Sequence, residues 1–220
     1  MRYSSHSMAL VRLGREWFPR IERCLDAFET KTAIDTVERL ARLLDRVVEW
    51  NEKLDLTAAR DPDELVDLFV ADAAKLAAAE PEPVAHWVDV GSGAGAPGLP
   101  LAVLLPAASF SLVEPKAKRV AFLRTALGAL GLTRVDVERM RSDALPSSGF
   151  DLAVSRATLE PQTWLEEGAR LARRAVWVLT ARSEPPAQVG WSVDLDCTYS
   201  WPLTGVQRRA LRYSPNRVAT

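Results

Sequence analysis

The sequence is poor in the residues that build metal centres and disulfide frameworks. Its 220 residues include two cysteines and two histidines. Cys24 and Cys197 lie far apart and form no CxxC pair, and His6 and His86 have no partners at metal-ligand spacing. We therefore expect no zinc or other metal site and no disulfide-stabilised fold.

Long apolar runs and a surplus of one charge are also missing. No stretch approaches the roughly 18 uninterrupted apolar residues of a membrane span, and the N-terminus does not resemble a secretory signal. We expect a monomeric, cytoplasmic protein with no membrane partner. The formal net charge of -1 excludes a generally basic nucleic-acid-binding protein but leaves room for a local basic patch.

The first part of the chain has the apolar spacing of helices. Apolar residues recur at steps of three and four over 8–28 and 34–50. A third helix over 61–79 begins with Asp61 as cap, Pro62 at the first helical position and Glu64 completing a capping box. The prolines at 81 and 83 mark a boundary. We expect a helical region over 1–80, packed on a second domain over 84–220.

The second part alternates short apolar runs with helical segments. Strands are predicted over 85–90, 109–114, 133–140, 150–155 and 174–180, and helices over 97–105, 115–130 and 161–172. Two more strands, over 191–199 and 206–213, follow with no helix between them. This order predicts a mostly parallel, doubly wound α/β sheet of Rossmann-like type with an antiparallel hairpin at its C-terminal edge.

A glycine-rich loop follows the first predicted strand. The stretch DVGSGAGAPG, residues 89–98, includes Gly91, Gly93 and Gly95, which allow the backbone to approach a ligand closely. Glu114 ends the second strand 23 residues after Gly91, counting 114 - 91, near the spacing of a ribose-binding acid. The pattern is compatible with a dinucleotide, with S-adenosylmethionine, or with a tight turn alone.

Two details favour S-adenosylmethionine over NAD. Asp89 at the strand end suits the ammonium group of a methionine and opposes a pyrophosphate. Pro97 stands where a dinucleotide-binding helix offers N–H groups to phosphate, and proline has none. Asp143, in RSDA after the third strand, is a candidate contact to the adenine amino group, or equally a solvated acid.

Four stretches together resemble one family. They are WNEKLDLTAARDPDEL (50–65), DVGSGAGAPGLPLA, LVEPKAKRVAFLR and FDLAVSRA (150–157), in that order. They are similar to the RsmG (GidB) family of class I methyltransferases, and the likeness covers most of residues 35–182. The resemblance implies an enzyme that transfers methyl from S-adenosylmethionine to N7 of a guanine in 16S ribosomal RNA, within rRNA processing, with the RNA or the 30S subunit as partner.

The resemblance also assigns roles to residues. Arg156 of SRA is the catalytic-site candidate, facing cofactor and target base; a salt bridge to Glu160 or Asp151 is the structural alternative. Because guanine N7 has a free lone pair, positioning can replace a general base. The cofactor pocket would be lined by Asp89, Gly91, Ser92, Gly93, Gly95, Glu114, Ser142 and Asp143.

The chain departs from the family pattern at two places. Leu68 and Phe69 stand where the family has an Arg-His pair, although Asp72 is kept, and TAR at 180–182 replaces a Lys-Gly pair. The alternatives are therefore an RsmG-like methyltransferase with a small-molecule or protein substrate, an inactive cofactor-binding interaction module and, as a minor candidate, a nicotinamide-dependent oxidoreductase.

Replacement RNA contacts have to come from other basic or aromatic residues. Phe69 is expected to be buried, and the tryptophans 164, 177, 191 and 201 to pack in the core or at an edge, unless one stacks on a base. Charged residues can also form an ordinary solvent-exposed face with no ligand. The candidate basic residues for RNA contacts are Lys116, Lys118, Arg119, Arg124, Arg139, Arg141, Arg182, Arg208, Arg209, Arg212 and Arg217.

Overall fold

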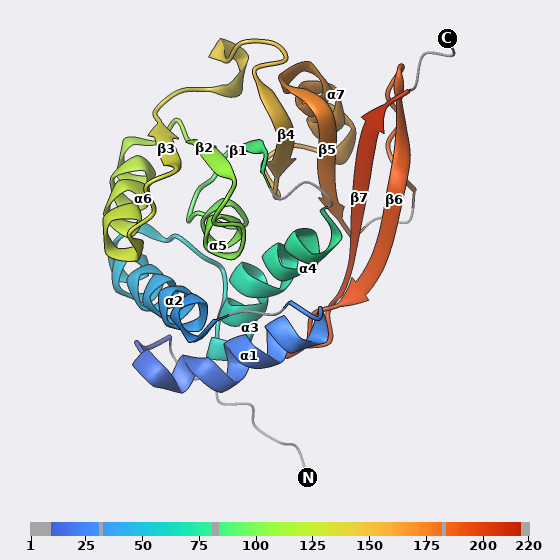
Figure 1. The fold of residues 1–220 in the computed structure, drawn as a ribbon. Coiled ribbons are helices and arrows are strands. Elements are labelled where there is room, and N and C mark those ends of the chain that lie inside the picture. The colour runs from blue at the N-terminus through green and yellow to red at the C-terminus, as the bar shows by residue number, and fades with distance from the viewer. Residues whose placement is uncertain (1–9, 31–32, 81–83, 182–183, 217–220) are drawn as a thin grey trace.

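A computed structural model describes residues 10–30, 33–80, 84–181 and 184–216. Their strands form one sheet in the order β3-β2-β1-β4-β5-β7-β6. β1 to β5 run parallel to one another, whereas β7 is antiparallel to both β5 and β6. The predicted doubly wound sheet with an antiparallel edge is confirmed (Figure 1). The strands are β1 (His86–Val90), β2 (Ser109–Val113), β3 (Val135–Glu138), β4 (Phe150–Ser155), β5 (Ala172–Thr180), β6 (Trp191–Ser200) and β7 (Gln207–Pro215).

Helices precede the sheet and connect its parallel strands. They are α1 (Phe18–Ala27), α2 (Ile34–Leu54), α3 (Pro62–Val66), α4 (Asp72–Ala79), α5 (Gly98–Leu104), α6 (Ala117–Leu130) and α7 (Pro161–Leu171). Short 3-10 turns lie at Gly14–Trp17 and Ser142–Ala144, and a π-helical segment joins α3 to α4 at Asp67–Ala71. These connections place helices on both faces of the sheet, as predicted.

Three helix predictions need correction. The first helix, expected from residue 8, begins with the 3-10 turn at Gly14; residues 8 and 9 lie outside the described part. In the predicted capping box, the Glu64 amide does donate to Asp61 Oδ1 at 2.9 Å, but the Glu64 carboxylate accepts from the Arg60 amide. The third helix is interrupted by the π-helical segment, because local periodicity does not report a one-residue change in hydrogen-bond spacing.

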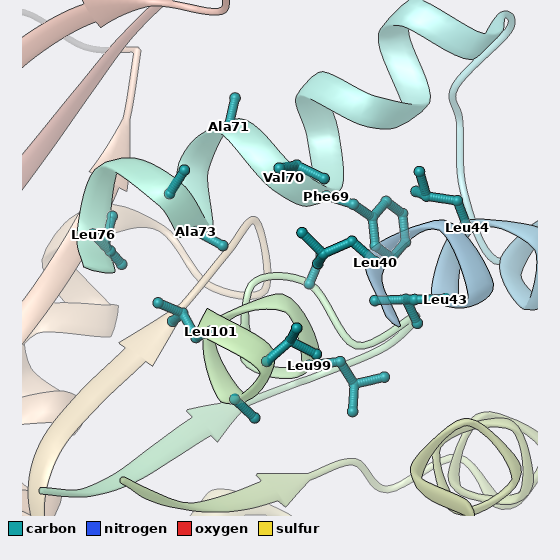
Figure 2. Close-up of a cluster of buried hydrophobic side chains, with 14 of the residues drawn as sticks. Leu40, Leu43, Leu44, Phe69, Val70, Ala71, Ala73, Leu76, Leu99 and Leu101 are labelled. Carbon is teal, nitrogen blue, oxygen red and sulfur yellow. The ribbon is translucent and has the colours of Figure 1, made fainter. Parts of the chain in front are cut away.

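The largest hydrophobic cluster joins the N-terminal helices to the sheet. Phe69 and Val70 pack toward Leu40 and Leu44 of α2, and Leu99 of α5 lies on the far side of Leu40 (Figure 2). Phe69 is fully buried, as expected. A second cluster on the opposite sheet face packs α7 onto β4 and β5. The chain on both sides of residues 81–83 therefore contributes to one continuous core, while those three residues lie outside the described part.

The antiparallel hairpin brings distant residues to the carboxyl edge of the sheet. Thr180, the last residue of β5, pairs with Arg209 near the start of β7. The β6–β7 turn is held beside the N-terminal helices by the buried carboxylate of Asp67, which accepts from the amides of Leu203 and Thr204. Figure 1 shows this end of the hairpin beside α1 and α3. In open α/β sheets, the carboxyl edge is where ligands bind.

Candidate functional site

Two adjoining clefts open at the carboxyl edge of the sheet. The smaller, about 470 Å³, lies over the glycine loop and Glu114. The larger, about 860 Å³, lies between the turn after β4 and the β6–β7 hairpin. The residues that line both clefts are Leu68, Arg156, Ala157 and Thr158. These four residues therefore form a wall that is common to the two clefts.

The glycine loop is bare because neighbouring groups approach its backbone. Gly91 has a φ of 70°, and a Cβ there would lie 2.4 Å from the Thr158 side chain. Gly95 has a φ of 90°, and a Cβ there would meet Leu99 at 2.4 Å. Gly91, Ser92 and Gly93 line the smaller cleft, whereas Gly95 does not and serves the packing of α5.

Glu114 is the buried acid of the smaller cleft. Its side chain is 3% exposed, and Oε2 accepts from the Gly93 amide at 3.0 Å while Oε1 accepts from the Lys116 amide at 2.8 Å. Arg119 Nη1 lies 4.0 Å from Oε2. The carboxylate is therefore fixed against the glycine loop, with further acceptor capacity on both oxygens for hydroxyl groups of a bound ribose.

Asp89 lies behind the loop and does not line either cleft. Its Oδ2 accepts from the Gly98 amide, the first of α5, at 3.0 Å, while the buried Oδ1 has no partner. Burial raises the pKa of Asp89 from 3.8 to about 7. This bond occupies the amide that a dinucleotide phosphate would use, so the start of α5 is not prepared for a pyrophosphate.

The predicted adenine contact lies apart from the cleft lining. Ser142 and Asp143 belong to the 3-10 turn after β3. Asp143 is exposed, and Arg141 Nε donates to its Oδ2 at 3.3 Å. Neither residue lines the smaller cleft. Their assignment to the cofactor pocket stays a prediction from the resemblance.

Arg156 stands in the wall that both clefts share. Its guanidinium donates to the Leu68 carbonyl, in the π-helical segment, and Nη1 lies 3.7 Å from Asp72 Oδ2. The expected structural alternative, a salt bridge to Glu160 or Asp151, is wrong, because the facing acid comes from α4. Burial lowers the pKa of Arg156 and the Asp72 charge opposes this, so the guanidinium stays charged.

Asp72 connects the shared wall to the hairpin. This carboxylate is 2% exposed, and its Oδ1 accepts from Tyr199 Oη at 2.8 Å and from Trp201 Nε1 at 2.7 Å. Burial, followed by the Asp72 charge, raises the pKa of Tyr199, so the phenol remains a donor. The sequence analysis missed Tyr199, and the only signal available was that Asp72 is an acid on an otherwise apolar helix face.

The basic and aromatic candidates divide between the clefts and ion pairs. Lys116 and Arg119 line the smaller cleft, and Arg208 and Arg209 line the larger one. The expectation that the tail arginines are available to contact RNA is wrong for Arg212, because its guanidinium pairs with Glu80 and Asp194. Arg182 and Arg217 lie outside the described residues.

Most tryptophans are packing residues, as expected. Trp164 and Trp177 are buried. The Trp164 ring N–H donates to the Trp177 carbonyl, and the Trp177 ring N–H donates to the Glu80 carboxylate. Trp191 packs at the edge of the second cluster. Trp201 is 6% exposed yet lines the larger cleft, with the Arg208 guanidinium 4.0 Å from its ring centroid.

Comparison with known proteins decides the family. A family model described as rRNA small subunit methyltransferase G (GidB) matches residues 36–188. The chain belongs to this family. The ribosomal RNA small subunit methyltransferase G of Halorhodospira halophila is 33% identical over 198 residues, which cover 86% of this chain and 92% of that protein.

Further relatives carry the same name. The protein of Chromohalobacter salexigens is 38% identical over 152 residues, 67% of this chain and 72% of its own length. The protein of Desulfitobacterium hafniense is 35% identical over 154 residues, 67% of this chain and 63% of its own length, so the match spans less than two thirds of that relative.

Solved structures agree on the fold. The chain is similar to a putative transferase of Pyrococcus horikoshii, with a TM-score of 0.54 at 15% identity, covering 68% of this chain and 63% of that one. It is also similar to P. horikoshii TYW2 in complex with MeSAdo, with a TM-score of 0.53 at 15% identity, covering 67% and 62%. These likenesses bear on the fold alone.

Family membership confirms the predicted class of enzyme. The chain is an S-adenosylmethionine-dependent methyltransferase of the rRNA methyltransferase G family. The nicotinamide-dependent oxidoreductase and the inactive interaction module are not favoured. Among the described residues, no helix is long and apolar enough to cross a membrane, and no group of three or more candidate metal ligands occurs.

Proposed function

We propose that this protein transfers the methyl group of S-adenosylmethionine to N7 of a guanine in 16S ribosomal RNA, as a monomer in the cytoplasm. The observation that carries the proposal is the wall of Arg156 and Leu68 between the two clefts. Cofactor on one side and nucleotide on the other would meet at that wall. The names of the curated relatives support RNA of the small subunit as the acceptor.

The residues of the smaller cleft fit S-adenosylmethionine. Gly91 lines the cleft with backbone alone, and the fixed Glu114 carboxylate offers acceptors to ribose hydroxyl groups. Asp89 has an unpartnered oxygen behind the loop, and its ionised fraction would add negative potential near the amino-acid moiety. When bound, this cofactor supplies an electrophilic methyl group on a sulfonium.

The residues of the larger cleft would position the acceptor. Guanine N7 presents a lone pair and no proton, so the chain needs no general base and can act by holding the base in line. Arg156 provides donors at the shared wall, and Asp72 balances its charge. A cation without that neighbour would oppose the positive sulfonium.

The test is methyl transfer with a defined acceptor. The protein would be incubated with methyl-labelled S-adenosylmethionine and 30S subunits, naked 16S RNA, transfer RNA or total protein, and the RNA digested to nucleosides for mass spectrometry. We expect label in 16S RNA as 7-methylguanosine, strongly reduced by Arg156→Gln. Label in protein or transfer RNA only, or in another nucleoside, would contradict the proposal.

A further inference from the structure

The larger cleft contains an arginine whose place follows from the strand order. Arg208 is the second residue of β7 and pairs with Tyr199 of β6. Because β7 runs antiparallel to β5, its first residues lie where the parallel strands end. Arg208 of β7 therefore lines the same cleft as Arg156, which lies in the turn directly after β4.

The charge of Arg208 is balanced differently from that of its neighbours. Arg209 pairs with Asp196 at 2.6 Å, and Arg212 pairs with Glu80 at 3.1 Å. Among the described residues, no carboxylate lies within 4.0 Å of the Arg208 guanidinium, whose hydrogen bonding there is limited to a 3.5 Å contact with the Gln207 carbonyl. A guanidinium that lines a cleft without an acid beside it is a ready ligand for an anion.

The Arg208 guanidinium packs on a ring that a buried hydrogen bond holds in place. Its guanidinium carbon lies over the Trp201 ring, 4.0 Å from the ring centroid, and the Trp201 N–H donates to Asp72 at 2.7 Å. The ring therefore cannot turn without breaking a buried hydrogen bond. A guanidinium that already packs on a ring held in this way loses less side-chain entropy when it binds a ligand.

We propose that Arg208, held on the Trp201 ring, binds a backbone phosphate of the acceptor RNA and so places the reactive nucleotide in the larger cleft. Trp201 covers one face, but the N–H donors in the guanidinium plane remain, and their fork matches two phosphate oxygens. Asp72 is the positioning residue, since it holds Trp201 and also lies beside Arg156. This inference rests on the proposed function.

The test is the salt dependence of RNA binding. Dissociation constants for 30S subunits or 16S RNA would be measured over a series of salt concentrations for wild type, Arg208→Gln and Arg208→Lys. Each lost phosphate contact lowers the slope of log K against log salt by about 0.7–0.9. We expect this loss and at least a several-fold weaker affinity for Arg208→Gln. Arg208→Lys should keep the slope but bind more weakly, because an ammonium lacks the planar fork.

A matched control separates this contact from net charge. Arg173, at the opposite end of β5, is 55% exposed and pairs with Asp151 at 2.8 Å. Arg173→Gln removes the same charge and should leave the slope unchanged. A slope for Arg208→Gln equal to that of wild type would overturn the inference, as would an equal loss in Arg173→Gln.

Two further readouts keep the result interpretable. Titration with S-adenosylmethionine should give the same affinity for wild type and Arg208→Gln; weaker cofactor binding would indicate a structural role and overturn the inference. If Arg208→Gln fails to fold, Arg208→Lys decides the matter, because unchanged affinity there would refute a bidentate phosphate contact. Failure of the proposed function is distinct, since wild-type protein would then transfer no methyl group to small-subunit RNA.

Discussion

Replacing Asp72 tests whether one carboxylate holds the shared wall and the hairpin together. Its Oδ1 accepts from Tyr199 and Trp201 at 2.8 and 2.7 Å, and its Oδ2 lies 3.7 Å from Arg156. Asp72→Ala leaves two buried donors and one guanidinium without this partner. Asp72→Asn can keep a carbonyl oxygen toward both donors, but it loses the charge and turns an NH2 group, which cannot accept, toward Arg156.

The expected cost follows from these contacts. A buried donor deprived of its acceptor costs about 1–3 kcal/mol, and breaking a buried ion pair costs about 3–5 kcal/mol. Because Arg156 keeps the Leu68 carbonyl and is partly exposed, we expect about 4 kcal/mol for Asp72→Ala in total. Asp72→Asn should cost about 1–2 kcal/mol.

The assay is urea unfolding together with thermal melting. For a domain of this size, 1 kcal/mol shifts Tm by about 2–4 °C, so Asp72→Ala should lower Tm by about 8–16 °C. Asp63→Ala is the control, because Asp63 is 49% exposed in its pair with Arg20 and a surface pair contributes at most about 1 kcal/mol. Equal losses for Asp72→Ala and Asp63→Ala would refute the reasoning.

Three further predictions concern the cofactor cleft. Gly91→Ala should cost more stability than Gly131→Ala and weaken S-adenosylmethionine binding. Both glycines have positive φ, but only Gly91 has a side chain, that of Thr158, within 4 Å of the added Cβ. Adding Thr158→Gly to Gly91→Ala should recover part of the lost stability, and no recovery would contradict the steric account. Burial raises the pKa of Asp89 to about 7, so the folded protein keeps a proton that the unfolded chain loses near pH 4. The contribution of Asp89 to the free energy of unfolding is therefore fully present below about pH 4 and is lost as the pH rises through about 7. In urea unfolding, the free energy of unfolding of Asp89→Asn should rise relative to that of wild type between pH 5 and pH 8, because only wild type loses stability there. A difference between the two proteins that stays constant with pH would contradict this. Glu114→Ala should weaken S-adenosylmethionine about 10- to 100-fold in calorimetric titration, the worth of a charge-assisted hydrogen bond; unchanged affinity would remove Glu114 from the site.

The architecture was accessible from sequence because its signals are local. Each parallel strand is a short apolar run next to a helical pattern, and the final pair of runs without a helix predicts the hairpin. The glycine loop and Glu114 were found for the same reason, since a strand end, a bare loop and an acid follow one another along the chain. Boundaries moved by a few residues, as for α2, which continues to Leu54.

The contacts within the site were less accessible because they are non-local. Asp72 meets Tyr199 and Trp201 across 127 and 129 residues, and no sequence period reports such a contact. Likewise, the tail around Arg209 has no acids of its own, but the adjacent strand β6 supplies Asp196. Sequence therefore located the glycine loop, Glu114 and Arg156, but it could not predict the larger cleft beside the hairpin or the charge pairs inside it.

The most direct test of the account is a crystal structure with S-adenosylhomocysteine bound. We predict the ribose at Glu114, the chain of the ligand over the loop at Gly91, and the sulfur at the wall of Arg156, directed toward the larger cleft. A ligand bound in the larger cleft, or a sulfur directed away from Arg156, would contradict the central claim that the methyl group passes between the two clefts.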